Sequence, residues 1–225
     1  GDGALFEKTL VRNQKGEPKK GLITALGLYS KDLEVGFGSM GGWEAFGVER
    51  EVTTSAKNVL YEIDGEPALE LYKSFLGDNA KELPASALFF PLSMRVKESK
   101  RPLVRTILNI NEEDQSLVFA GDLPMGSRVQ FMKSNSYKLI DGAEEAARTV
   151  MSQLKNEPDL ALLVSCVGRK LVMKQLTEEE VEIVKDTLGA TTVAGFYSYG
   201  ELAPFDAFMK CELHNQTMTI TTLKD

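Results

Sequence analysis

The feature of this sequence that most constrains its fold is the run Leu160–Val167, in which Ser165 is the only polar residue. A strand with one exposed face alternates apolar and polar side chains, and this run does not. The run is therefore predicted to be a strand that is buried on both faces. Helical patterns precede and follow it, so the chain is expected to read helix, strand, helix, strand after about residue 140.

Two helices are predicted around this strand from the spacing of apolar residues. The first spans 141–154 and presents a face of small residues, which can approach a sheet closely. The second spans 177–188; Thr177 and Glu180 have the spacing of a capping box at its start, and Gly189 follows its end. Glutamates 178–180 are otherwise expected on a solvated face. Further strands are expected at 192–196 and 216–223.

The part of the chain before residue 134 has a different sequence pattern, because short runs of residues with high β-propensity dominate it. One helix is predicted after Pro67, and Gly77 suits its C-terminal cap. We place a module boundary between Lys133 and Asp141, which gives a β-rich module (1–136) and a smaller module of helices packed on a mixed sheet (137–225). The predicted fold class is α+β, or mixed α/β. Strands are expected at 4–11, 22–29, 34–37, 51–54, 58–63, 102–110, 116–119 and 128–133.

Composition excludes several classes of protein. The 225 residues include 26 basic and 33 acidic side chains, a net charge of −7, which argues against a nucleic-acid partner. No apolar run approaches the ~20 residues of a membrane span, and no secretory segment is visible at the start. Two cysteines favour a reducing, cytoplasmic location over a disulfide scaffold. The chain begins Gly-Asp-Gly without an initiator Met, so it is expected to be processed or a piece of something longer.

A glycine motif at 36–41 matches the G-x-G-x-x-G fingerprint of dinucleotide-binding proteins. That fingerprint needs a following helix, whose N-terminal amides and dipole hold the pyrophosphate. Here Trp43 and then a strand pattern follow, so we interpret the motif as a glycine-rich turn. Trp43 either packs this turn against the sheet or lines a pocket.

The end of the buried strand is the first candidate binding site, because ligands of α/β sheets collect at that end of a strand. Cys166, Gly168 and Arg169 lie there. The Arg169 guanidinium could bind a carboxylate with two hydrogen bonds, and a structural salt bridge is the alternative. Cys166 beside it could be a reactive thiol, although a small buried apolar residue is the commoner role of a free cysteine.

A second group of candidates ends the next strand, where Tyr197, Tyr199 and Glu201 occur within five residues. Tyrosine combines an apolar ring with a polar tip, which is typical of small-ligand pockets. Glu201 could neutralise an ammonium group of a ligand. The alternative is an ordinary strand whose tyrosines lie on its outer face.

His214 is the only histidine, and Asn215 follows it. Cys211 and His214 alone do not make a zinc site, which needs three or four ligands, so no metal is predicted. Cys166 and His214 could form a catalytic pair in space, although nothing in their spacing requires it. No residue set points to a cofactor.

Three joined segments of the C-terminal part resemble FIST proteins, which are bacterial sensory modules with distant eukaryotic relatives among F-box proteins. The segments are 164–169, 195–204 and 213–219, and the resemblance continues backward through 41–53 and 61–77. Residues 1–136 then correspond to the C-terminal portion of the FIST N-type module and 137–225 to the C-type module. The first half of the usual N-terminal part is missing, which again suggests a piece of something longer.

The resemblance implies a cytoplasmic sensory domain that binds a small ligand, such as an amino acid or a small carboxylate, and signals to an output domain or protein. The residues singled out above are the expected ligand-binding set, with no catalytic residue. Two alternatives stay open: an enzyme that uses Cys166 and His214, and a protein-docking module that binds no ligand. The expected ligand-binding residues are Cys166, Gly168, Arg169, Tyr197, Tyr199, Glu201, His214 and Asn215.

Overall fold

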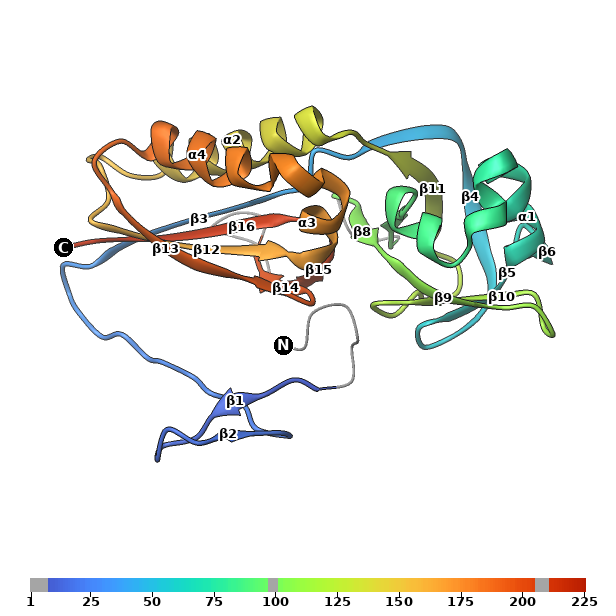
Figure 1. Ribbon diagram of the computed structural model, residues 1–225, viewed down its shortest axis with the longest axis horizontal. Coiled ribbons are helices and arrows are strands. Elements are labelled where there is room, and N and C mark those ends of the chain that lie inside the picture. The colour runs from blue at the N-terminus through green and yellow to red at the C-terminus, as the bar shows by residue number, and fades with distance from the viewer. Residues whose placement is uncertain (1–7, 97–100, 205–210) are drawn as a thin grey trace. The chain divides into compact units, whose positions relative to one another are not determined.

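The computed structural model of the chain describes residues 8–96, 101–204 and 211–225 (Figure 1). The chain divides into two compact units, one made of residues 1–33 with Asp225 and the other of residues 34–224. The candidate site lies entirely in the second unit.

The first unit contains one short antiparallel pair, β1 (Val11–Arg12) with β2 (Pro18–Lys19). The side chain of Asn13 closes the turn between them by accepting from the backbone N–H groups of Lys15 and Glu17. The predicted strand at 22–29 is wrong, because these residues pair with no strand in the described part of the unit. β-Propensity alone does not make a strand without a partner. Half of the predicted strand at 4–11 lies outside the described residues, and in the other half only Val11 belongs to a strand.

An eight-stranded antiparallel sheet forms the first half of the second unit, in the order β8-β7-β11-β4-β5-β10-β9 with β6 beside β5. Helix α1 (Ala68–Leu76) buries Leu69 and Tyr72 against it, which confirms the helix predicted after Pro67. The strands are β4 (Glu44–Ala56), β5 (Val59–Ile63), β6 (Glu66–Pro67), β7 (Leu92–Arg95), β8 (Leu103–Arg105), β9 (Ile107–Asn111), β10 (Ser116–Phe119) and β11 (Arg128–Lys133). The 3-10 helices η1 (Gly77–Glu82) and η2 (Ala85–Phe89) follow α1.

The second half is built on a four-stranded mixed sheet with the order β13-β12-β16-β3. Strands β12 and β13 are parallel, and the other two pairs are antiparallel. The strands are β3 (Glu34–Met40), β12 (Leu160–Cys166), β13 (Thr192–Ser198) and β16 (Met218–Lys224). The helices are α2 (Ser136–Met151), α3 (Val167–Met173) with the 3-10 turn η3 (Lys174–Leu176), and α4 (Thr177–Leu188). A small pair, β14 (Glu201–Ala203) with β15 (Glu212–His214), completes the α+β fold, which confirms the predicted class.

Helices α2 and α4 lie together on one face of the four-stranded sheet (Figure 1). The prediction that the run 160–167 is buried on both faces is therefore wrong: Ala161 and Leu163 are buried beneath the helices, whereas Leu160 and Leu162 on the other face are 37% and 43% exposed. The apolar run predicts a strand correctly, but it does not indicate which faces of that strand are covered by helices.

The glycine motif at 36–41 is not a turn; most of it lies in strand β3 under helix α2. A Cβ atom at Gly38 would lie 2.4 Å from the carbonyl oxygen of Ala146, so glycine permits the close approach of helix and strand. Helix α2 also begins earlier than the predicted residue 141. The Asn135 side chain caps it by accepting from the backbone N–H of Lys138.

Strand β3 pairs along its whole length with β16, so residues 34–40 share a sheet with residues 218–224. This pairing joins segments at opposite ends of the chain, and nothing local in either segment indicates it. The module boundary between residues 136 and 137 stays a prediction. In the described ranges, no helix is long and apolar enough to cross a membrane.

Candidate functional site

The parallel strands β12 and β13 end at the same edge of the sheet, where β14, β15 and the loop before β16 also lie. This brings together seven residues with polar or sulfur-containing side chains, which we call the strand-end cluster. Six of them are buried, and Ser198 is partly buried. Polar groups buried in this way need hydrogen-bond partners within the protein. The cluster consists of Cys166, Ser198, Glu201, His214, Asn215, Gln216 and Thr217.

Glu201 has two hydroxyl donors and little contact with solvent, since it is only 3% exposed. Its Oε1 accepts from the Ser198 hydroxyl at 2.5 Å, and its Oε2 accepts from the Thr217 hydroxyl at 2.9 Å. Burial raises the pKa of Glu201 to about 7, although the two hydroxyls and the positive charge of Arg169 partly oppose the rise. Both protonation states of this carboxyl are therefore accessible near neutral pH.

His214 and Asn215 fix the cluster to neighbouring backbone. His214 lies opposite Glu201 in the β14–β15 pair, and its Nε2 lies 2.8 Å from the carbonyl oxygen of Ala203. Burial lowers the pKa of His214, so the ring is neutral at neutral pH and Nε2 donates to that carbonyl. The Asn215 side-chain oxygen accepts from the backbone N–H of Thr106, which connects the cluster to the eight-stranded sheet.

Cys166 is buried, and its thiol is not activated. Burial, with a smaller contribution from the negative charge of Glu201, raises the pKa of Cys166 to about 12; the backbone N–H groups of Gln216 and Gly168 and the charge of Arg169 only partly oppose this. The thiol is therefore protonated at neutral pH, whereas a nucleophilic cysteine needs the thiolate.

Gly168 allows the fully buried Gln216 to lie against the start of helix α3, because a Cβ atom at position 168 would lie 2.7 Å from Gln216 Oε1. The Gln216 side-chain amide donates to the carbonyl oxygen of Leu88, while its Oε1 has no hydrogen-bond partner among the described residues. Trp43 donates its indole N–H to the Gln216 carbonyl, so it packs the turn after β3 against the sheet.

Arg169 is fully buried beneath helices α2 and α4, and protein acceptors bind its guanidinium group. Its Nε pairs with Oε1 of Glu180 at 2.6 Å, and its terminal nitrogens donate to the carbonyl oxygens of Gly41, Gln216 and Leu139. This is the structural salt bridge that the sequence left open as the alternative. A ligand carboxylate could reach Arg169 only if these bonds opened.

Glu180 is the residue that sequence reasoning missed, because it was expected on a solvated face and is fully buried instead. Its Oε2 accepts from the hydroxyls of Ser165 at 3.0 Å and Tyr197 at 3.4 Å, in addition to the bond with Arg169. The predicted capping box is also wrong: the helix has no side-chain cap, and the Thr177 hydroxyl donates to the carbonyl of Lys174. A signal was present, since Glu180 precedes the buried residue Val184 by one helical turn.

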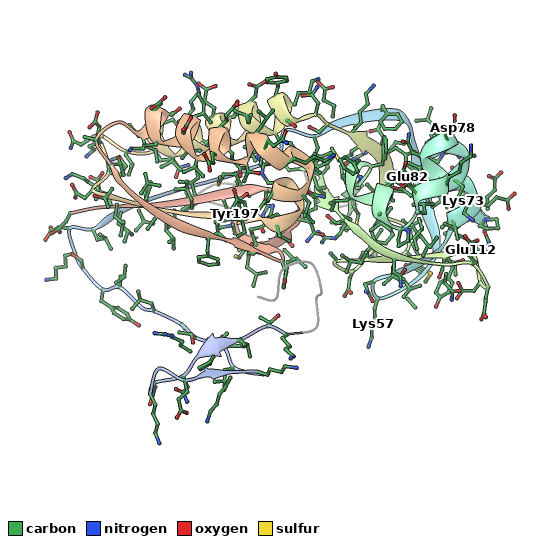
Figure 2. All side chains as sticks on the ribbon, in the orientation of Figure 1. Lys57, Lys73, Asp78, Glu82, Glu112 and Tyr197 are labelled. Atoms are coloured by element: carbon green, nitrogen blue, oxygen red, sulfur yellow. The ribbon has the colours of Figure 1, made fainter. Side chains whose placement is uncertain are left out.

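A cavity of about 240 Å³ lies between helix α4 and strands β12 and β13. The two hydroxyls that bind Glu180 belong to its lining, and the ammonium of Lys170 lies 5.0 Å from the ring centroid of Tyr197, the tyrosine labelled in Figure 2. Burial, together with the nearby charge of Glu180, raises the pKa of Tyr197 to about 12, so its hydroxyl stays a donor. The cavity is lined by Leu163, Ser165, Val181, Val193, Ala194, Gly195, Phe196, Tyr197 and Met218.

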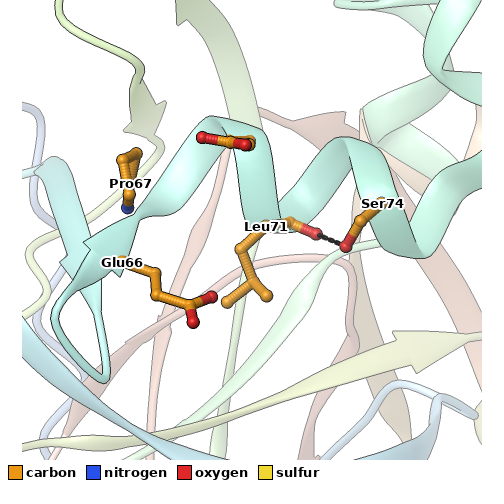
Figure 3. A pocket seen from close by; sticks show the side chains of 5 residues that line it. Glu66, Pro67, Leu71 and Ser74 are labelled. Atoms are coloured by element: carbon orange, nitrogen blue, oxygen red, sulfur yellow. Dashed lines mark hydrogen bonds between the residues drawn. The ribbon is translucent and has the colours of Figure 1, made fainter.

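A second cavity, of about 370 Å³, lies beside helix α1 and contains none of the predicted site residues (Figure 3). The structure thus brings four predicted residues into the strand-end cluster and places Arg169 and Tyr197 together on Glu180. Tyr199 is half-buried in the connection between β13 and β14. In the described part of the chain, no group of three or more His, Cys, Asp or Glu side chains is placed to hold a metal ion.

The sequence matches two family descriptions that together cover most of the chain. Residues 1–66 match the FIST N domain, and residues 68–204 match the FIST C domain. The chain therefore belongs to the FIST family, whose domains are in general sensory modules implicated in small-ligand binding.

The chain is also similar to curated proteins that are described as uncharacterized. An uncharacterized protein of Mycobacterium tuberculosis is 26% identical over 102 residues, which cover 45% of this chain and 27% of the relative. An uncharacterized protein of Methanocaldococcus jannaschii is 27% identical over 161 residues, covering 64% of this chain and 30% of the relative. The chain thus spans less than a third of the length of these relatives. No solved structure gives a significant match.

Proposed function

We propose that this chain is a cytoplasmic sensory domain that binds a small ligand, such as an amino acid or a small carboxylate, and passes the signal to an output protein or domain. The cavity between α4 and β13 is the single observation that carries the proposal. Its walls are mostly apolar and include the hydroxyls of Ser165 and Tyr197, a composition typical of small-molecule sites. Its volume of about 240 Å³ suits a ligand of amino-acid size.

The predicted site residues other than Tyr199 each have a role in this proposal. Tyr197 contacts the ligand in the cavity, and Arg169 holds Glu180 in place behind the cavity wall because its own donors are already engaged. Lys170, at the Tyr197 ring, supplies a positive charge for a ligand carboxylate. Glu201 lies outside the cavity lining with its oxygens bound by Ser198 and Thr217, so it would accept from a ligand ammonium group only if these bonds opened.

The remaining cluster residues would carry the signal rather than make the first contact. Cys166 ends β12 in register with Ser198 of β13, Gly168 lies in α3, and His214 and Asn215 lie at the end of β15. A ligand that shifts β13 would therefore change the packing at this strand end. Sensing then requires only that the ligand bind one of two conformations more tightly than the other. The two free cysteines, Cys166 and Cys211, support the reducing cytoplasmic location.

A thermal-shift screen against free amino acids and small carboxylates tests the proposal. A ligand at about 100 times its Kd adds roughly 2.7 kcal/mol to the free energy of unfolding. For a chain of this length, Tm should rise by ~5–10 °C. The variant Val181→Phe, which fills the cavity from helix α4, should abolish the shift.

The matched control is Val48→Phe, which adds the same bulk at an exposed position on β4 outside the cavity and should keep the full shift. A screen without any shift would contradict the proposal, and so would a shift that survives Val181→Phe. The docking alternative is favoured by one observation, the exposed apolar side chains on the open face and edge of the four-stranded sheet.

A further inference from the structure

Strand β13 is an unprotected edge of the four-stranded sheet. It pairs with β12 through seven consecutive residues without a register shift, and no other described strand pairs with it. Its opposite side therefore presents backbone N–H and C=O groups to solvent. Natural edge strands are usually blocked by charges, proline or bulges, and Thr192–Ser198 contains none of these.

The other edge of the same sheet is protected. The side-chain amide of Gln153, just after helix α2, bonds to both backbone groups of Phe37 in β3: its Oε1 accepts from the N–H at 3.2 Å and its Nε2 donates to the C=O at 2.7 Å. Glu34 adds a charge at the start of that strand. The chain itself thus blocks β3 at its central residue, whereas among the described residues no such contact occupies the edge of β13.

We propose that β13 pairs with β13 of a second copy of this chain, in an antiparallel register centred on Gly195. The two four-stranded sheets would then form one continuous sheet across a twofold axis. Because β13 is the open edge and β3 is blocked, the pairing closes as a dimer and does not propagate into a filament.

In this register, the side chains of β13 are complementary to those of β13 in the second copy. Val193 of each copy lies opposite Tyr197 of the other, and Ala194 lies opposite Phe196, so each aromatic ring faces a smaller apolar side chain. Phe196 is 61% exposed in the single chain, and this pairing covers it. The remaining pair joins Thr192 with Ser198.

The strand itself places no charge against a second copy. The whole chain carries a net charge of −7, whereas the residues of β13 carry none, so the twofold axis brings no like charges into direct opposition. An interface made by seven residues on each side falls below the standard size of stable complexes, so a reversible dimer is expected. Added salt should tighten it, because it screens the repulsion between two acidic copies.

Sedimentation equilibrium of the full chain across a concentration series tests the proposal. The wild type should show a monomer–dimer equilibrium, and Ala194→Lys should raise its dissociation constant by about tenfold or more, since a charged lysine on an edge strand opposes pairing and removes the apolar contact with Phe196 of the other copy. The control Val35→Lys places the same charge on the same sheet face at the blocked edge, and should leave the dimer unchanged. A monomer at all concentrations would overturn the proposal, as would a dimer that survives Ala194→Lys.

Disulfide trapping tests the register itself. In a Cys211→Ser background, copies with Ala194→Cys mixed with copies with Phe196→Cys should cross-link, because these positions oppose one another across the axis. Each variant alone should cross-link far less, since neither position lies opposite itself. Equal cross-linking by a single variant would overturn the register, and absence of cross-linking in the mixture would overturn the pairing. Both substituted positions are exposed in the single chain, so folding is expected to be retained, and circular dichroism checks it.

Discussion

The Nε atom of Arg169 lies 2.6 Å from Oε1 of Glu180, and neither side chain has any contact with solvent. The pair joins the start of helix α3 to the first turn of α4, and through the other guanidinium donors it also holds the carbonyl of Leu139 in α2. An ion pair in this position organises the layer of helices, because either charge without its partner would be buried and uncompensated.

Glu180→Ala should lower the free energy of unfolding by about 3–5 kcal/mol, since it leaves the guanidinium of Arg169 buried without its counter-charge. The double variant Arg169→Met with Glu180→Ala should lose less than the sum of the two single losses, because no charge is then left unpaired. Urea unfolding of Glu180→Ala, Arg169→Met and the double variant measures the three losses. Glu178→Ala, at an exposed position on the same helix, is the control and should change stability by about 0.5 kcal/mol or less.

Stability should depend on pH through Glu201. Its folded-state pKa of about 7 lies above the ordinary value of 4.5, so the folded chain binds more protons than the unfolded chain between these values. The contribution of this carboxyl is therefore fully present at low pH and is lost as pH rises through about 7. Glu201→Gln removes the titration.

Between about pH 5 and pH 8, the wild type should lose up to about 3 kcal/mol of unfolding free energy relative to Glu201→Gln. Groups common to both proteins cancel in this difference. A difference that stays constant with pH, or that moves in the wild type's favour, would show that Glu201 is not a buried carboxyl of raised pKa.

Cys166 should resist alkylation, because burial keeps its thiol protonated. Iodoacetamide at neutral pH is expected to label the exposed Cys211 and to leave Cys166 unmodified until the chain is unfolded in urea. Mass spectrometry of the peptides distinguishes the two sites, so Cys211 is the internal control. Rapid labelling of Cys166 in the folded chain would instead support the enzyme alternative with His214.

Sequence reasoning succeeded where a pattern is local. The apolar run at 160–166 is a strand, the spacing after Thr177 is a helix, and the family motifs identified the segments that meet at the strand-end cluster. It failed for Glu180, whose spacing from Val184 and Leu188 would have placed it on the buried face.

The sequence by itself determined the helices α1, α2 and α4 but not α3, most of the strands of the second unit, the α+β class and the family, because periodicity and motif order are properties of neighbouring residues. Only the tertiary structure decided that β3 lies beside β16, that Leu160 and Leu162 face outward, and that Arg169 is bound by the protein. The physical reason is that an amphipathic segment specifies which of its faces is apolar. The element that covers this apolar face and the partner of each buried charge depend on segments that are distant in the sequence.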